Sequence, residues 1–223
     1  MNLQGRPWRL VVVDLDGTLI TGTTAASHLD DWIGHGPAVK ELERRFLNGE
    51  ITNAEVAAQY GPLYRGIALA DARAAVESVP CLDDIVLGTS LLHGRRIEAV
   101  IATASWSFAA QALADLWGFD AVRGVELEVD PATSTFTGRI SRDCEPEDKI
   151  AFVVDRCERL GVGLDEVVAI GDGRSDLPLF SAVGFSVALN ASPEVQAAAS
   201  MSVDSQSFLA ALRAVPGLLD ASV

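Results

Sequence analysis

The stretch VVVDLDGTL at residues 11–19 constrains the fold of this chain more than any other part of its sequence. Three valines that run into a glycine turn indicate a strand buried on both faces of a parallel sheet. The strand ends in Asp14 and Asp16, and ligands bind at the carboxyl edge of the strands in open α/β sheets. Two carboxylates so close together raise each other's pKa or need a cation beside them. The stretch therefore predicts a metal site or an acid–base pair, and the alternative is a strand end with two solvated acids.

The amino-acid composition is that of a globular protein with a large negative charge. Hydrophobic residues make up 49% of the 223 residues, and the formal net charge is −14. Such a charge argues against a nucleic-acid backbone as partner. A small anionic substrate then requires local positive charge from a metal or a lysine.

The cysteines and the apolar runs bear on where the protein works. The three cysteines are scattered and form no Cys-x-x-Cys pair, which indicates a reducing compartment and no structural zinc. Residues 1–9 contain no apolar signal segment, and no run of about 18 apolar residues occurs in the chain. We therefore expect a cytoplasmic protein with no membrane partner, and the sequence leaves a monomer or a homodimer open.

Two kinds of sequence pattern predict two domains. Outside residues 20–80, apolar strands alternate with helical patterns, which indicates an α/β fold with a doubly wound, parallel, Rossmann-like sheet. Residues 20–80 contain no convincing strand, and glycine and proline divide their helical patterns into short pieces. We expect residues 20–80 to form a helical cap of three to five helices, and residues 1–19 and 81–223 to form the core domain.

The core pattern also predicts individual elements. A strand at residues 97–102 is expected to stop at a strand-to-helix turn over residues 103–105. The other expected strands lie at residues 8–13, 125–129, 135–140, 167–170 and 185–189. The expected helices lie at residues 83–92, 108–116, 148–160, 177–182 and 206–215, with a further helix opening at Pro193.

Polar side chains follow the predicted strands or open a predicted helix, so the parallel topology gathers them on one edge of the sheet. Four acids cannot share a dry crevice without a cation, and oxygen ligands without His or Cys select a hard ion such as Mg²⁺. Mg²⁺ takes few carboxylates and usually accepts an oxygen of a substrate phosphate. This set predicts phosphoryl transfer, in which positioning and charge stabilisation dominate. Its members are Asp14, Asp16, Thr103, Lys149, Asp172 and Asp176.

These motifs, in this order, resemble the haloacid dehalogenase superfamily of phosphatases. They are DLDGT at residues 14–18, Thr103 after VIA, Lys149, and GDGRSD at residues 171–176. The segment VALNASPEV at residues 187–195 resembles the one that follows the last motif in the phosphoserine phosphatase subgroup. The resemblance covers nearly the whole chain. It implies a Mg²⁺-dependent phosphatase of a small phosphorylated metabolite, with a C1-type helical cap inserted in its core.

The resemblance also implies the catalytic roles. Asp14 is the nucleophile and forms an aspartyl-phosphate, and Asp16 is the general acid for the leaving alkoxide and then the general base for water. An acid at Asp16 favours phosphate esters over haloacids, because a halide leaves without a proton.

The implied ligand sets share several of these residues. Backbone N–H groups of an Ala104–Ser105 turn at a helix N-terminus are expected to add phosphate donors. The phosphate-binding residues are Thr103, Ala104, Lys149 and Gly17. Mg²⁺ is expected on Asp14, the Asp16 carbonyl and Asp172, with Asp176 as a ligand or a support.

The cap departs from phosphoserine phosphatase where that enzyme anchors its substrate. Phosphoserine phosphatase holds the substrate amine with a glutamate, and the matching position here is near Thr23. It holds the substrate carboxylate with an arginine, and the matching residue here is Tyr60, with Arg65 nearby. Each lost charge-assisted bond is worth roughly 1.5–3 kcal/mol, which makes phosphoserine a doubtful substrate. In the last motif, Ser175 replaces an asparagine and can still hydrogen-bond near the phosphate. The substrate-pocket candidates are therefore Thr23, Tyr60, Arg65 and Ser175.

Two other functions stay open. A phosphotransferase or mutase would pass the phosphoryl group from Asp14 to a hydroxyl other than water, and a regulatory binding protein would keep the fold with little catalysis. In the cap, His28 and His35 flank Asp31 at helical spacing and allow a second metal site, although an exposed helix is favoured. Cap–core packing is favoured over a substrate pocket for Trp32, Phe46, Tyr60 and Tyr64.

Overall fold

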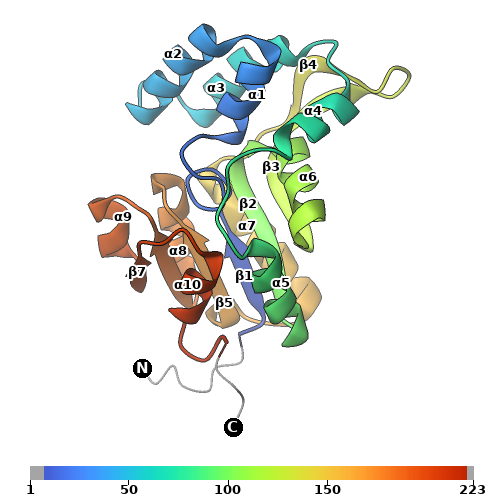
Figure 1. Cartoon of the computed structure of the whole chain (residues 1–223). Helices are drawn as coiled ribbons and strands as arrows, with labels where there is room; N and C mark the ends of the chain where they lie inside the picture. The colour runs from blue at the N-terminus through green and yellow to red at the C-terminus, as the bar shows by residue number, and fades with distance from the viewer. Residues whose placement is uncertain (1–7, 220–223) are drawn as a thin grey trace.

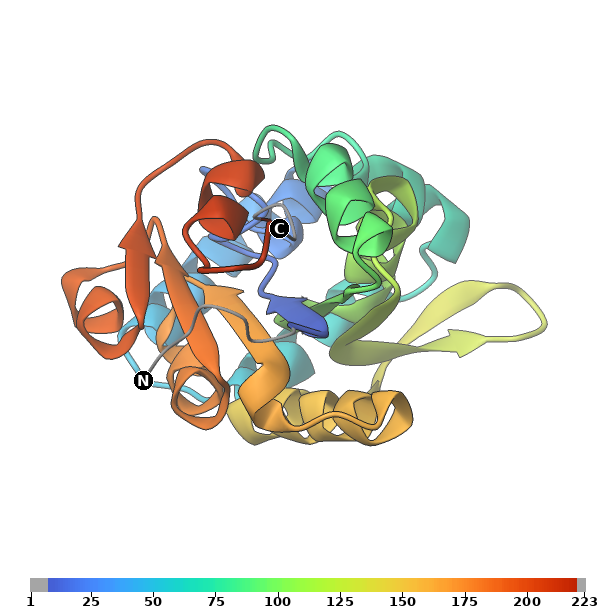
Figure 2. The same cartoon turned by 90° about the horizontal axis from the view of Figure 1, so that it is seen from below.

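The computed structural model describes residues 8–219, which form one seven-stranded sheet with helices on both faces (Figures 1 and 2). The strand order is β4-β3-β2-β1-β5-β6-β7, and every neighbouring pair is parallel except β3 and β4. The predicted α/β class with a doubly wound parallel sheet is confirmed. The strands are β1 (Leu10–Val13), β2 (Glu98–Trp106), β3 (Ala121–Asp130), β4 (Thr135–Arg142), β5 (Val167–Gly171), β6 (Phe185–Leu189) and β7 (Met201–Val203).

Ten α-helices and three short 3-10 helices lie within the described residues. The α-helices are α1 (Ala25–Ile33), α2 (Gly36–Leu47), α3 (Asn53–Tyr60), α4 (Leu69–Val76), α5 (Ile85–Gly94), α6 (Ser107–Trp117), α7 (Pro146–Leu160), α8 (Leu177–Ala182), α9 (Pro193–Ala198) and α10 (Phe208–Arg213). The 3-10 helices are η1 (Gly61–Tyr64), η2 (Leu164–Glu166) and η3 (Arg174–Asp176). None of the helices in residues 8–219 combines the length and apolar character that crossing a bilayer requires.

The central strand β1 is buried on both faces, as its run of valines predicts. Val11 and Val13 belong to the apolar layer that α5, α6 and α10 cover, and Leu10 and Val12 belong to the layer under α7, α8 and α9. Successive side chains of a strand point to opposite faces, so four apolar residues in a row fill both layers. Figure 2 shows the two groups of helices on opposite sides of the sheet. The burial of β1 places its C-terminal end, and thus Asp14, at the middle of the sheet edge.

Strand β2 differs from its prediction. It continues through residues 103–105 to Trp106, with an irregular register against β3 between Ala102 and Trp106, and α6 begins only at Ser107. Pairing with β3 and the burial of Trp106 extend the strand, and neither is visible in the local sequence. The Ala104–Ser105 peptide is therefore part of an irregular strand and not the N-terminus of a helix.

The C-terminal elements show smaller differences. Strand β7 was not predicted, because its exposed, mixed residues lack the apolar pattern of a buried strand. The last helix, α10, is shorter at both ends than the range of residues 206–215.

Residues 20–80 form α1 to α4 and η1, with no strand of the sheet, as predicted for a cap (Figure 1). Helix α3 begins with a capping box, in which Thr52 Oγ1 accepts from the Glu55 N–H (3.2 Å) and the Glu55 carboxylate accepts from the Thr52 N–H (2.8 Å). The β3–β4 hairpin reaches these helices, since Gly61 packs against Gly138 and Ala68 forms a bridge with Thr135. The division into a core and a cap stays a prediction, and the hairpin lies against both parts.

Gly124 on β3 offers a test of the packing that shapes the end of β2. A Cβ at Gly124 would lie 2.7 Å from the Ser105 carbonyl oxygen and 3.0 Å from the Ser107 nitrogen, which are backbone atoms. We expect Gly124→Ala to lower the free energy of unfolding by about 1–3 kcal/mol in urea titrations, because these atoms must shift. Gly94→Ala is the control, since a Cβ there meets open space. Equal loss in the two variants would contradict the expectation.

Candidate active site

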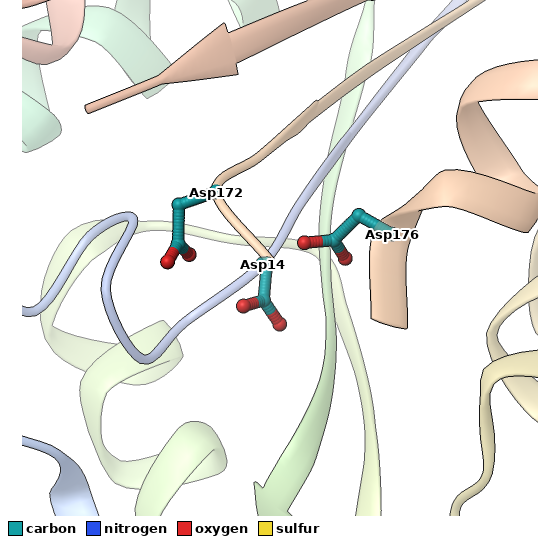
Figure 3. Close-up of side chains that lie close together, drawn as sticks. All are labelled: Asp14, Asp172 and Asp176. Atoms are coloured by element: carbon teal, nitrogen blue, oxygen red, sulfur yellow. The ribbon is translucent and has the colours of Figure 1, made fainter. Parts of the chain in front are cut away.

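Three buried or half-buried carboxylates converge at the C-terminal edge of the sheet (Figure 3). Asp14 follows β1, Asp172 follows β5, and Asp176 closes η3. One oxygen atom of each lies within 4.8 Å of the others, and Asp14 and Asp176 are at most 8% exposed. Parallel pairing of β1 with β5 brings the ends of these strands together, as predicted. The structure therefore places three acids of the predicted set in one cluster.

Lys149 neutralises part of this cluster. Its Nζ donates to Asp14 Oδ1 at 2.9 Å and to Asp176 Oδ1 at 2.7 Å, and it lies 3.3 Å from Ser175 Oγ. Burial alone would lower the pKa of Lys149, but the two carboxylates outweigh burial and raise that pKa above its usual value. Lys149 is therefore a fixed cation beside Asp14. Its helix α7 begins at Pro146, and the lysine thus lies in the first turn.

The three acids retain an excess of negative charge. Burial raises the pKa of Asp14 well above its usual value, and Asp176 and Asp172 add to this against the effect of Lys149. Burial likewise raises the pKa of Asp172 to about 6, although the Thr18 hydroxyl donates to its Oδ1 at 2.7 Å. Without a cation, the raised pKa values mean that Asp14 and Asp172 keep their protons to a higher pH than free carboxyl groups do. This behaviour suits a site that exchanges protons for a hard cation.

The loop after β1 places the second motif acid and brings it beside the cluster. Asp16 Oδ1 accepts from the Ala25 N–H at 2.7 Å, at the start of α1, where the helix dipole favours a carboxylate. Gly17 has φ +84°, and a Cβ there would lie 2.3 Å from Asp172 Oδ2. Only glycine allows this approach, so Gly17 is needed for the fit of the loop against Asp172.

A cavity of about 610 Å³ opens above the cluster, between the sheet edge and the helices of residues 20–80. Lys149 and Asp176 are not among the residues that line the cavity. Lys149 lies next to it, in contact with both Asp14 and Asp176. Thr103 is buried, and its hydroxyl accepts from the Ser105 N–H at 3.1 Å. The predicted site residues that line the cavity are Asp14, Asp16, Gly17, Thr23, Tyr60, Thr103, Ala104, Asp172 and Ser175.

Arg65 does not reach this cavity. It follows η1 and lines a separate depression with Phe136 and Arg139, and its Cβ lies beside Gly138 on β4. The turn of η1 carries the chain from the cavity wall to the outer side of the hairpin. The structure therefore does not bring Arg65 to the cavity that the other substrate-pocket candidates line, whereas Tyr60 on the preceding helix lines it.

Three residues that sequence reasoning did not assign hold the site in place. Thr18 orients Asp172, and its hydroxyl inside the first motif was a usable signal. Asn53 Nδ2 donates to the carbonyls of Ala104 (3.2 Å) and Cys144 (3.0 Å), and Glu145 Oε1 accepts from the Ala54 N–H at 3.0 Å. The partners of Asn53 lie 51 and 91 residues away, so no local pattern announces them.

The remaining cap candidates divide into packing and lining residues. The single group of possible metal ligands within residues 8–219 excludes His28 and His35, and His28 Nε2 lies 3.2 Å from the Ala75 carbonyl oxygen. Tyr64 is buried against Trp106, Phe108 and Phe136. Phe46 lines the cavity, whereas Trp32 is 49% exposed elsewhere on the cap.

Comparison with known proteins gives consistent results. A sequence model described as haloacid dehalogenase-like hydrolase matches residues 11–181. A phosphoserine phosphatase from Polaromonas sp. (strain JS666) is 25% identical over 213 residues, covering 91% of this chain and 88% of that protein. A haloacid dehalogenase family hydrolase from Salmonella enterica serovar Typhi has a TM-score of 0.85 at 16% identity, over 99% of this chain and 75% of that one. A solved structure of a phospho-aspartyl intermediate analogue of phosphoserine phosphatase has a TM-score of 0.78 at 18% identity. The match covers 93% of this chain and 98% of that chain.

The structure thus combines a mostly parallel α/β sheet with a carboxylate that follows its central strand and is paired with a buried lysine. This chain belongs to the haloacid dehalogenase-like hydrolase family, whose model spans most of its length. The family and the phosphoserine phosphatase relatives support an enzyme of the phosphoric monoester hydrolase class. The resemblance inferred from the four motifs is thereby confirmed.

The raised pKa of Asp172 predicts a pH-dependent stability. The usual pKa is 3.8, and the folded protein holds the proton up to about pH 6, so stability falls as the pH rises through this window. In EDTA, we expect Asp172→Asn to be more stable than the wild type above pH 6 and to lose this advantage below pH 4. Thermal unfolding of both proteins from below pH 4 to above pH 6 measures this difference in stability. The exposed Asp204→Asn serves as control, and an Asp172→Asn curve parallel to the wild-type curve would refute the expectation.

The bridging role of Asn53 is testable against a second amide on the same helix. Asn53→Ala leaves two carbonyl groups without their donor, so we expect the free energy of unfolding to fall by about 1–3 kcal/mol. Gln59→Ala, at an exposed position of α3, should change it by less than about 0.5 kcal/mol. Urea titration of both variants measures the difference. Equal stabilities would show that Asn53 does not join α3 to the core.

Proposed function

We propose that this protein is a Mg²⁺-dependent phosphatase that hydrolyses a small phosphorylated metabolite through an aspartyl-phosphate on Asp14. The observation that carries the proposal is the 2.9 Å contact between Lys149 Nζ and Asp14 Oδ1, within a cluster that also holds Asp172 and Asp176. A carboxylate is a poor nucleophile toward an anionic phosphate unless nearby cations screen the repulsion. The solved relative described as a phospho-aspartyl intermediate analogue supports the same chemistry.

The donor set fits Mg²⁺. Oxygen atoms of Asp14, Asp172 and Asp176 lie within 4.8 Å of one another, and hard cations select such oxygen ligands. Asp14, Asp172 and the Asp16 carbonyl would hold the ion, while Asp176, which is paired with Lys149 at 2.7 Å, would support the site. Bound Mg²⁺ would supply positive charge next to the phosphoryl oxygens.

The side chains of this chain then divide the reaction between them. An Asp14 carboxylate oxygen attacks phosphorus while the bond from phosphorus to the ester oxygen breaks, and Asp16 gives its proton to the departing alkoxide. Lys149 and Thr103 hold charge and geometry around the phosphoryl group. Asp16 next takes a proton from water as the water oxygen attacks phosphorus, which frees Asp14 and releases inorganic phosphate. The position of Asp16 on the cavity wall, held by the Ala25 N–H, suits both transfers.

Substitution of the nucleophile tests the proposal. We expect Asp14→Asn to reduce Mg²⁺-dependent hydrolysis of p-nitrophenyl phosphate by roughly 10³-fold or more, because an amide cannot accept the phosphoryl group. Intact-mass analysis of the wild type under rapid quench should show one added phosphoryl group that the variant lacks. Exposed Asp204→Asn is the matched control. Turnover retained in Asp14→Asn would overturn the assignment.

An added acceptor alcohol separates hydrolysis from transfer. A phosphatase releases inorganic phosphate, whereas a phosphotransferase or mutase yields a new ester. The cytoplasmic location of the protein stays a prediction from the sequence, as does its state as a monomer or a homodimer.

A further inference from the structure

The cavity above Asp14 has two ends of different chemistry. Its acidic end is formed by the motif residues Asp14, Asp16 and Asp172. Its other end is formed by residues of the cap helices and the neighbouring strands, and none of the cap side chains that the structure describes along the cavity is charged. The residues that give this end its apolar character are Phe46, Ile51, Val56, Tyr60, Trp106 and Val125. A phosphoryl group at Asp14 would therefore direct the rest of the substrate toward an apolar wall.

Three polar residues of the cap that line the cavity, Thr23, Thr24 and Asn53, already make hydrogen bonds within the protein. The side-chain amide of Asn53 donates to the carbonyls of Ala104 and Cys144. Thr23 Oγ1 lies 3.4 Å from the Thr24 carbonyl oxygen, and Thr24 Oγ1 accepts from the Ser27 N–H at 3.0 Å. A charged group that entered this end would lose its water without gaining a charged partner, which is costly.

The charged residues outside the acid cluster belong to the core side of the cavity. Arg174 is exposed on η3, and Glu145 Oε1 is occupied by the Ala54 N–H. A zwitterionic substrate would need partners for an ammonium and a carboxylate on the side of the cavity that faces away from the phosphate. The cap side chains that the structure describes along the cavity provide neither.

The apolar wall is preorganised by aromatic packing. Tyr60 and Trp106 are buried, and their rings meet edge to face with centroids 6.3 Å apart, while Tyr64 supports Trp106 at 5.4 Å. Phe46 is 37% exposed although it lines the cavity. An apolar ligand that covered Phe46 would remove this surface from water, which favours binding.

We propose that the alcohol part of the substrate is uncharged and apolar, with several carbon atoms or an aromatic ring, and that Phe46 and Val56 help to select it. This inference rests on the proposed phosphatase activity and names the substrate class for the same site. The volume of about 610 Å³ lies in the range of about 300–1,000 Å³ that organic ligands occupy. A phosphorylated amino acid would leave the apolar wall unused.

A series of phosphate esters tests the substrate class. The ratio kcat/KM is measured with Mg²⁺ for n-alkyl phosphates from methyl to hexyl, for 2-phenylethyl phosphate, for ethanolamine phosphate and for O-phospho-L-serine. We expect kcat/KM to rise by about fourfold for each added methylene until the cavity is filled. For ethanolamine phosphate and O-phospho-L-serine, whose alcohol parts are charged, kcat/KM should be lower than for alkyl phosphates of similar size. A flat series, or a preference for O-phospho-L-serine, would overturn the inference.

Two exposed aromatic residues of the cap form a matched pair. Phe46 lines the cavity and Trp32 does not, and both are large and exposed. We expect Phe46→Ala to lower kcat/KM for hexyl and 2-phenylethyl phosphates by about tenfold and to leave methyl phosphate unchanged. Trp32→Ala should leave all three unchanged. Equal effects of the two substitutions would contradict the role of Phe46.

A charge introduced at Val56 reverses the expected preference. Val56→Arg should lower kcat/KM for hexyl phosphate and raise it for O-phospho-L-serine, whereas Val56→Leu should do neither. Circular dichroism checks that each variant is folded. If wild type turns over p-nitrophenyl phosphate in an Asp14-dependent way while the ester series is flat, only the substrate class fails. If no ester is turned over, the proposed phosphatase fails, and the substrate class fails with it.

Discussion

The structure depends on one buried cation among carboxylates. Lys149 is 1% exposed and contacts both Asp14 and Asp176, and removal of such a partner leaves a buried charge without compensation. The contact requires the end of β1, the end of η3 and the start of α7 to meet at one point. Along the chain, Asp14 lies 135 residues from Lys149, and Asp176 lies 27 residues from it. The parallel sheet satisfies this requirement, because β1 and β5 end side by side. The sheet topology and the charge balance of the site thus constrain each other.

The same cluster is a source of local instability that the rest of the fold offsets. Burial raises the pKa of Asp14 and Asp172, so their ionised forms are disfavoured in the folded protein without a cation. Two glycines allow the crowding: a Cβ at Gly17 would meet Asp172, and a Cβ at Gly171 would lie 2.4 Å from Asp176 Oδ2. Apolar layers on both faces of the sheet provide the compensating stability. Close packing and like-charge repulsion are thus concentrated at the sheet edge where the three acids meet.

The cavity joins a part that the motifs determine to a part that they leave open. Residues at the sheet edge carry the charge, and the helices of residues 20–80 with Trp106 and Val125 carry the apolar wall. Hydrogen bonds from Asn53 to Ala104 and Cys144 connect the two parts, so the position of α3 is tied to the backbone beside Thr103 and to the start of α7. The proposed chemistry and the proposed substrate choice therefore depend on different residues that line the same cavity.

The sequence by itself determined the α/β class, the helical character of residues 20–80 and the polar set at the strand ends. Local patterns suffice for these, because buried strands, motif glycines and acids at strand ends are encoded over a few residues. Only the tertiary structure decided that β2 continues to Trp106, that Arg65 lines a separate depression and that Asn53 joins α3 to the backbone of Ala104 and Cys144. These outcomes depend on partners far along the chain, such as β3, β4 and Cys144, so no local pattern contains them. The segment of residues 11–19 therefore indicated the family and the position of the acids, whereas long-range packing shaped the cavity beside them.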